Sequence, residues 1–143
     1  MNAKNYVYIL MVIAVFFSSC NTNKISIPNT LETDLRNKSN YRYYCQLVNK
    51  SIQGDTLALK EIMLISDIYD GAGYEHGCIM IEIMKAIGDN QFNKGLNRLS
   101  DSQKENVKQY IDVGIDFLSL TTQERNNMAK KNPMTYKTLQ LHN

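Results

Sequence analysis

Apolar residues recur at a helical spacing through most of the chain after residue 40. An unbroken stripe runs from Val107 to Leu118, and a similar stripe covers residues 41–52. Shorter or weaker patterns of the same kind cover residues 59–69, 92–99 and 121–131. A period near 3.6 residues is typical of amphipathic helices that share a core. We therefore predict an all-α fold, a small irregular bundle of about five helices.

Residues 74–87 differ from these stripes because they are apolar almost all round. From residue 78 onward, Glu82 and Lys85 are the only charged side chains of this segment. A helix with apolar residues on every side is typical of the centre of a domain. The isoleucines of "CIMIEIM" also fit a buried strand, but the methionines and the neighbouring helical patterns favour a helix. We predict a central buried helix here.

Two Gly-Asp pairs, at residues 54–55 and 88–89, mark junctions between predicted helices. Glycine favours the position after a helix end, and aspartate favours the N-cap of the next helix. The pairs lie 34 residues apart, a period that suits stacked helical hairpins, although the signature residues of a tetratricopeptide repeat are absent. Stacked hairpins and a plain bundle both stay open.

Further end signals lie toward the C-terminus. Ser100 and Thr121 are each followed three residues later by Gln or Glu, the pattern of a capping box. Pro133 should stop the last weak helix. The remaining residues read as a tail that docks through Tyr136 and Leu139.

The N-terminus has the three parts of a secretory signal peptide: a charged start at Lys4, an uncharged run over residues 6–17, and two small serines before Cys20. A membrane-spanning helix needs about 20 apolar residues. The uncharged run would cover only about 18 Å as a helix. The run is therefore long enough for export and too short to remain as a span.

The sequence Phe17-Ser18-Ser19-Cys20 resembles the lipobox of bacterial lipoproteins, although Phe17 stands where Leu is usual. The resemblance covers residues 1–20 only. It implies a diacylglycerol on the Cys20 sulfur, cleavage just before Cys20, and acylation of the new N-terminus with a chain such as palmitate. Two or three acyl chains would hold the protein firmly on a membrane. An ordinary signal peptide or an uncleaved anchor is the alternative.

This resemblance divides the chain into three parts. Residues 1–19 would be a lipoprotein signal peptide, residues 20–40 a flexible tether, and residues 41–143 the helical domain. The tether prediction depends on the polar, Asn-rich composition after Cys20. Asn21 is not the Asp that tends to retain lipoproteins in the inner membrane of enteric bacteria, so the outer membrane of the cell envelope is favoured.

Composition disfavours nucleic acid as a partner. Lys and Arg total 16 against 14 acidic residues, and no cluster of five or more basic residues occurs. Nucleic-acid binding proteins carry a strong basic patch. We predict no cofactor either, because none of the nucleotide-binding or hydrolase motifs occurs in a suitable context.

Cys45 and Cys78 are a candidate disulfide pair. An exported protein lies in a compartment that permits disulfides. A bridge closing this loop would stabilise the fold by about 3–4 kcal/mol in the chain-entropy model. Two unbridged buried thiols, which behave as small hydrophobic groups, are the alternative.

The segment "YDGAGYEHG" interrupts the helical pattern with three glycines and is predicted to be an exposed loop. Its candidate binding residues are Tyr69, Asp70, Tyr74, Glu75 and His76. The Glu75 and His76 side chains are of types that bind metals, but adjacent residues of a helix point about 100° apart. We therefore predict no metal site.

The chain has nine tyrosines and no tryptophan, and Tyr41, Tyr43 and Tyr44 are clustered. Exposed tyrosines would favour contacts with another protein, and the alternative is that these rings line the rim of the core. We expect a lipid-anchored, non-catalytic protein-binding module, with an immunity-type inhibitor as one form of it. The expected partners are a membrane, through the lipid, and another protein. The alternatives are a small envelope enzyme or metal-binding protein that uses Glu75 and His76, or a structural envelope lipoprotein.

Overall fold

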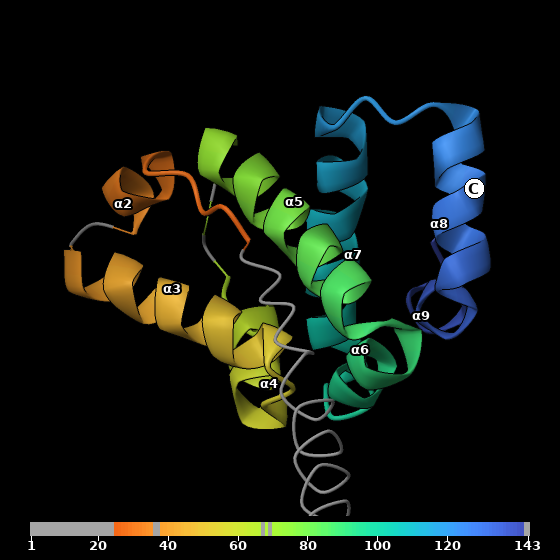
Figure 1. The fold of residues 1–143 in the computed structure, drawn as a ribbon, viewed down its shortest axis with the longest axis horizontal. Helices are drawn as coiled ribbons and strands as arrows, with labels where there is room; N and C mark the ends of the chain where they lie inside the picture. The colour runs from red at the N-terminus through yellow and green to blue at the C-terminus, as the bar shows by residue number, and fades with distance from the viewer. Residues whose placement is uncertain (1–24, 36–37, 67, 69, 142–143) are drawn as a thin grey trace, which may run out of the picture.

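A computed structural model describes residues 25–35, 38–66, 68 and 70–141 of the 143-residue chain. These residues form eight helices and no strand (Figure 1). The helices are α2 (Thr30–Asp34), α3 (Lys38–Ile52), α4 (Thr56–Met63), α5 (Asp70–Ile87), α6 (Asp89–Leu96), α7 (Asp101–Phe117), α8 (Thr122–Lys131) and α9 (Pro133–Leu139). The predicted all-α class is confirmed, whereas the count of about five helices was too low.

Helices α5 and α7 are the central pair of the bundle and lie side by side in Figure 1. The segment that could have been a strand is helical, and Ile81, Ile83 and Met84 are fully buried. The two helices cross at Gly77 and Gly114. A Cβ atom on Gly77 would lie 2.1 Å from the backbone oxygen of Tyr110. Only glycine permits an approach this close.

The other helices cover the two sides of this pair. Helices α3 and α4 pack against each other on one side, and α3 also contacts α5. On the other side α9 packs on α6 and α7, and α8 contacts α9 (Figure 1). Because α5 makes its most extensive contact with α7 rather than with its neighbour α6, the helices are not a simple stack of consecutive hairpins.

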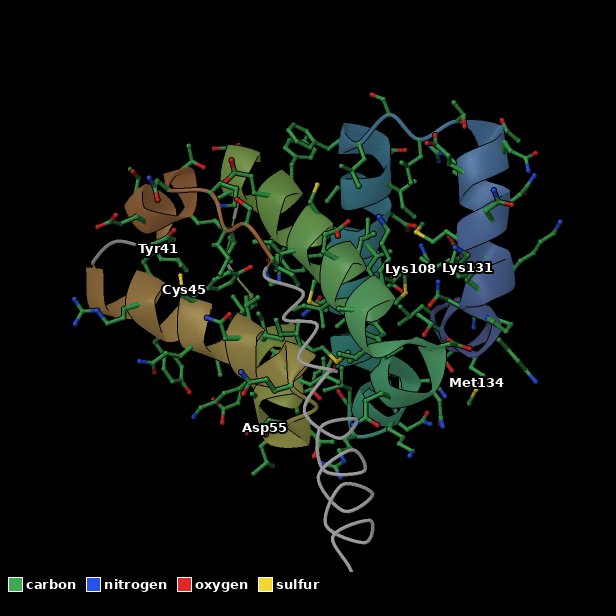
Figure 2. All side chains as sticks on the ribbon, in the orientation of Figure 1. Tyr41, Cys45, Asp55, Lys108, Lys131 and Met134 are labelled. Carbon is green, nitrogen blue, oxygen red and sulfur yellow. The ribbon has the colours of Figure 1, made fainter. Side chains whose placement is uncertain are left out.

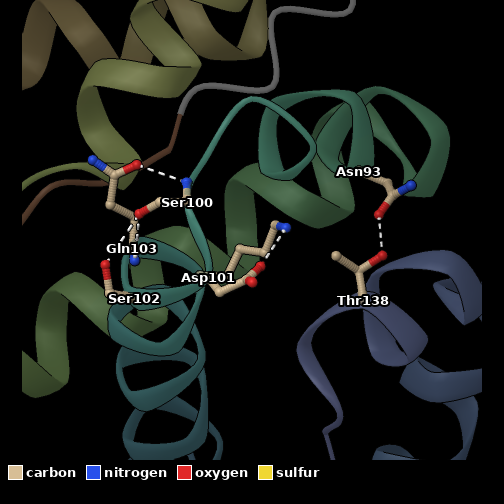
Figure 3. A network of polar contacts seen from close by, with 7 residues as sticks. Asn93, Ser100, Asp101, Ser102, Gln103 and Thr138 are labelled. Carbon is tan, nitrogen blue, oxygen red and sulfur yellow. Dashed lines mark hydrogen bonds and ion pairs between the residues drawn. The ribbon is translucent and has the colours of Figure 1, made fainter.

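A junction forms at both Gly-Asp pairs, but only Asp55 is an N-cap, because Gly88 is the N-cap of α6 and Asp89 is its first helical residue. Gly54 has a φ of 91° and Gly88 a φ of 78°, in the region that glycine adopts without strain. The Asp55 carboxylate accepts hydrogen bonds from two backbone N–H groups at the start of α4. Ser100 forms a complete capping box with Gln103, as Figure 3 shows. Thr121 forms another at the start of α8.

The C-terminal segment is a helix rather than a tail. Pro133 does follow the end of α8, but it also occupies the first turn of α9, where its missing N–H is no loss. The Asp89 carboxylate accepts hydrogen bonds of 2.8 Å from the backbone N–H groups of Met134 and Thr135. Docking of this segment through Tyr136 and Leu139 is confirmed, since both side chains are buried.

One side-chain contact ties α9 to α6 in addition to these caps. The Thr138 hydroxyl donates a hydrogen bond of 2.7 Å to the Asn93 side chain (Figure 3). Asn93 is buried, so this bond gives its amide oxygen a partner. Polar and apolar contacts thus both hold α9 in place.

The packed region begins before residue 41, the predicted start of the domain. Leu31 of α2 is fully buried, and Ile25 and Ile27 pack against the core. The Tyr41 hydroxyl donates a hydrogen bond of 3.2 Å to the Ile27 backbone oxygen. The prediction of a flexible tether over residues 20–40 is therefore wrong for residues 25–35, because a few apolar side chains in a polar segment suffice to anchor it.

Among the described residues, no helix is both long enough and apolar enough to cross a membrane. The segment predicted to be a signal peptide, residues 1–19, lies outside the described residues.

Candidate functional site

The predicted binding loop is the first part of helix α5. Residues 70–76 are helical, whereas Tyr69 and the proposed lipidation residue Cys20 lie outside the described residues. Three glycines suggested a break because each weakens an isolated helix by about 1 kcal/mol. Packing against α7 at Gly77 outweighs that weakness. The loop prediction is therefore wrong for residues 70–73, whereas residues 74–77 belong to the helix that the sequence predicted from residue 74.

His76 is a core residue rather than a surface residue. It is buried, and its Nδ1 lies 2.7 Å from the Tyr44 hydroxyl oxygen. Its ring also meets the Tyr110 ring edge-on, with 4.6 Å between the centroids. Nε2 has no hydrogen-bond partner among the described residues. Burial lowers the pKa of His76 to about 4, so the imidazole is neutral at physiological pH.

Glu75 lies one residue earlier and faces helix α2. Its carboxylate accepts a hydrogen bond from the Thr30 hydroxyl, with oxygen–oxygen distances of 2.6 and 2.5 Å. This contact joins α5 to α2. The described residues contain no group of three or more His, Cys, Asp or Glu side chains that could hold a metal ion.

Cys45 and Cys78 are both free thiols in the structure, so the candidate disulfide is not formed. Figure 2 shows Cys45 on α3. Cys78 instead faces α7, where its Sγ lies 3.9 Å from the Gly114 backbone oxygen. Burial raises the pKa of the Cys78 thiol, which makes the unreactive protonated form more stable.

Among the described residues of the predicted loop, Tyr74 presents an exposed ring. Its ring stacks on Phe117 at the end of α7, with 5.6 Å between the centroids and an interplanar angle of 18°. Tyr74 is 42% exposed and Phe117 is 57% exposed. Leu118, next to Phe117, is also exposed. We call Tyr74, Phe117 and Leu118 the aromatic patch.

A groove with a volume of about 480 Å³ adjoins the aromatic patch, between the start of α5 and the middle of α7. It is lined by Ser66, Ile68, Asp70, Gly73, Tyr74, Asn106, Gln109, Tyr110 and Val113. Asp70 is the one charged residue among these. The Tyr110 hydroxyl, on one wall, lies 3.4 Å from both the backbone nitrogen and the backbone oxygen of Ile68. This contact holds Ile68, which lies on the opposite wall of the groove, against α7.

The three tyrosines near the start of α3 do not form a second exposed cluster. Tyr44 is buried, and Tyr41 is partly buried under its contact with Ile27. Tyr43 alone of the three is exposed, and its hydroxyl donates to the Glu61 carboxylate of α4. The segment therefore offers a single ring to a partner.

Sequence reasoning found Tyr74 and Asp70 but missed Phe117 and the α7 wall of the groove. Phe117 lies at the edge of the apolar stripe of its helix, between Asp116 and Leu118. An aromatic side chain on the solvent side of an amphipathic helix is itself a signal of a contact surface. Pairing it with Tyr74, 43 positions earlier in the chain, required the fold.

Comparisons with known proteins add no relative. No protein-family model matches the chain, and neither a curated protein nor a solved structure matches it.

Proposed function

We propose that this chain is a lipid-anchored protein of the bacterial cell envelope that binds another protein through the aromatic patch and the adjoining groove. The role is non-catalytic, and an immunity-type inhibitor is one form that it could take. The observation that carries the proposal is the stacked, exposed pair of Tyr74 and Phe117.

Exposed aromatic rings of this kind favour protein contacts for two reasons. Each ring can bury a large apolar area, and stacking already restricts the movement of both rings, so binding costs less entropy. Tyr is among the residues that dominate binding energies in interfaces. The groove beside Tyr74 gives a partner side chain a concave place to enter.

The binding test compares two double variants. We expect Tyr74→Ser with Phe117→Ser to lose most partner recovered by cross-linking and immunoprecipitation from the envelope, without lowering the melting temperature. Leu57→Ser with Met134→Ser removes two other exposed apolar side chains, 66% and 44% exposed, and should retain the partner. Equal recovery by both variants would contradict the proposal. His76 is unsuitable for this test, because its replacement disturbs the core.

The lipid anchor is tested separately. Cys20→Ser removes the sulfur that the lipobox resemblance identifies as the attachment point. We expect the variant to keep its signal peptide, migrate at a different mass and lack the added acyl chains in mass spectrometry. A variant that matures at the wild-type size and stays with the outer membrane would contradict lipidation.

The alternative of a metal-binding protein or enzyme that uses Glu75 and His76 has less support. Glu75 already accepts the Thr30 hydroxyl, and His76 is enclosed by two tyrosines. Metal analysis of the purified, tag-free chain tests it. Stoichiometric metal that is lost in Glu75→Gln would favour this alternative over the protein-binding role.

A further inference from the structure

A second groove lies between α8 and α9, at the end of the bundle away from α2 and α3 (Figure 1). Its volume is about 470 Å³. It is lined by Gln123, Asn126, Ala129, Lys130, Tyr136, Lys137 and Leu141. It shares no residue with the aromatic patch or the groove beside it, so a ligand bound here would be separate from the partner of the proposed function.

The charge of this groove is positive. Lys130 extends from α8 and Lys137 from α9, and no acidic side chain is among the described residues that line the groove. Neither lysine forms an ion pair with a described residue. Lys131, the next residue along α8, adds a further positive charge nearby (Figure 2). Two ammonium groups on facing elements attract an anion between them.

Three nearby acidic groups already have partners. Asp112 of α7, whose negative charge acts on the Tyr136 hydroxyl, forms an ion pair with Lys108. The Glu124 carboxylate accepts the backbone N–H and the hydroxyl of Thr121 at the start of α8. Asp116 forms an ion pair of 3.1 Å with Arg125. None of the three carboxylates lines the groove. The lysines are therefore left to solvent or to an added anion.

Tyr136 supplies the second observation. Its side chain lines the groove and is only 7% exposed, yet its hydroxyl has no hydrogen-bond partner among the described residues. Buried hydroxyl groups are normally paired, and an unpaired one costs free energy. The oxygen itself is covered in the structure, so a phosphate oxygen reaches this O–H group and gives it an acceptor only after the side chains over it move aside. The amide N–H groups of Asn126 are further donors on the same groove.

We propose that the α8–α9 groove binds a phosphate group. The Lys130 and Lys137 ammonium groups supply the charge, and the Tyr136 hydroxyl donates a hydrogen bond to a phosphate oxygen. Lysine suits phosphate because it acts as a compact point charge with three donors. The phosphate belongs either to a small soluble ion or ester or to the headgroup of a phospholipid.

The experiment measures how far each lysine is protected from an amine-acetylating reagent by mass spectrometry, using the full chain in phosphatidylcholine vesicles. Inorganic phosphate is added at constant ionic strength. We expect acetylation of Lys130 and Lys137 to fall about tenfold when phosphate reaches about ten times its dissociation constant. Lys50 and Lys60, on α3 and α4, are the internal controls and should not change.

A second arm replaces part of the phosphatidylcholine with phosphatidylglycerol and adds no phosphate. Protection of the two groove lysines in the first arm identifies a soluble anion as the ligand. Protection that occurs only in the second arm identifies an anionic headgroup as the ligand. Either of these two results supports the proposal. Equal protection of all four lysines, or protection of none in either arm, would overturn it.

The hydroxyl is tested by Tyr136→Phe, which keeps the ring. We expect the dissociation constant for the ligand found in these two arms to rise about tenfold, while the melting temperature stays level or rises because an unpaired buried hydroxyl is removed. Lys130→Gln with Lys137→Gln should abolish binding, whereas Lys50→Gln with Lys60→Gln should not. An unchanged dissociation constant in Tyr136→Phe would overturn the assignment.

Discussion

His76 couples the protonation of one side chain to the stability of the fold. Its pKa is about 4 in the folded chain against 6.5 for a free histidine. Between these values the unfolded chain binds more protons than the folded chain, so the free energy of unfolding falls as the pH falls. We expect a loss of about 2 kcal/mol between pH 7 and pH 5, measured by urea unfolding.

The control for this prediction is His76→Gln. The variant has no titrating group at this position and should show a much flatter pH dependence over the same range, whatever its absolute stability. The range stays above the ordinary pKa of carboxylates, which limits their contribution. The same slope in variant and wild type would show that another group is responsible.

Gly77 is the residue that fixes the distance between the two central helices. In Gly77→Ala the new methyl group would lie 2.1 Å from the Tyr110 backbone oxygen and 2.9 Å from the Gly114 nitrogen. Backbone atoms cannot rotate away, so α5 and α7 must separate. We expect a loss of about 3 kcal/mol or more in the free energy of unfolding.

Gly71 provides the matched control on the same helix. A Cβ at Gly71 meets nothing within 4 Å. Because alanine favours helices over glycine, Gly71→Ala should be neutral or stabilise the fold by up to about 1 kcal/mol. Equal losses in the two variants, measured by thermal and urea unfolding, would contradict the close packing of α5 on α7.

At the scale of elements, the Asp89 carboxylate holds the start of α9 against the start of α6. It accepts the backbone N–H groups of Met134 and Thr135, which otherwise have no partner within their helix. We expect Asp89→Ala to cost about 1 kcal/mol in the free energy of unfolding. The amide hydrogen-exchange rates of this variant should rise more in α9 than in α5.

Asp101→Ala is the comparison for this cap. Among the described residues, Asp101 pairs with Lys104 alone, at 3.1 Å, and its side chain is fully exposed to solvent. Exposed pairs of this kind contribute little. A cost for Asp89→Ala no larger than for Asp101→Ala would contradict the role of Asp89 as a cap between helices.

The helices that sequence patterns predicted are those with long periodic stripes and clear end signals. Residues 41–52 and 100–118 had such stripes, and their predicted end signals form as expected at Gly54 and Ser100. The start of α5 was missed because glycine lowers helix stability, and the sequence shows the glycines. The close contact of Gly77 with α7, which stabilises the helix, appears only in the fold. Helix α9 was missed because Pro133 was interpreted as a stop, although proline also suits a helix start.

The candidate site shows a similar limit. Tyr74 and Asp70 could be selected from the sequence because polar and aromatic residues gather there. The pairing of Tyr74 with Phe117, and the burial of His76, depend on how α5 turns relative to α3 and α7. A one-residue change in helix register moves a side chain by about 100°, so local patterns could not separate the exposed residue from the buried one.

At the scale of the whole molecule, the packed N-terminal segment shortens the connection to any lipid on Cys20. The described chain starts at Ile25, whose side chain is partly buried against the core. Five Cα–Cα steps separate Cys20 from Ile25, and a fully extended chain covers about 17 Å over that length. If Cys20 carries the proposed lipid, the domain must lie close against the membrane surface.

Neutron reflectometry on supported bilayers measures this separation directly. We expect the lipidated wild type to form a protein layer in contact with the headgroups. Inserting a flexible linker of about 20 Gly and Ser residues between Asn23 and Lys24 adds a reach of about 25 Å and should introduce a water-rich gap. The same linker appended after Asn143 leaves the tether unchanged and should leave the layer in contact. A wild-type layer already separated from the headgroups by a gap would mean that the anchor lies elsewhere or that residues 25–35 detach from the bundle at the membrane.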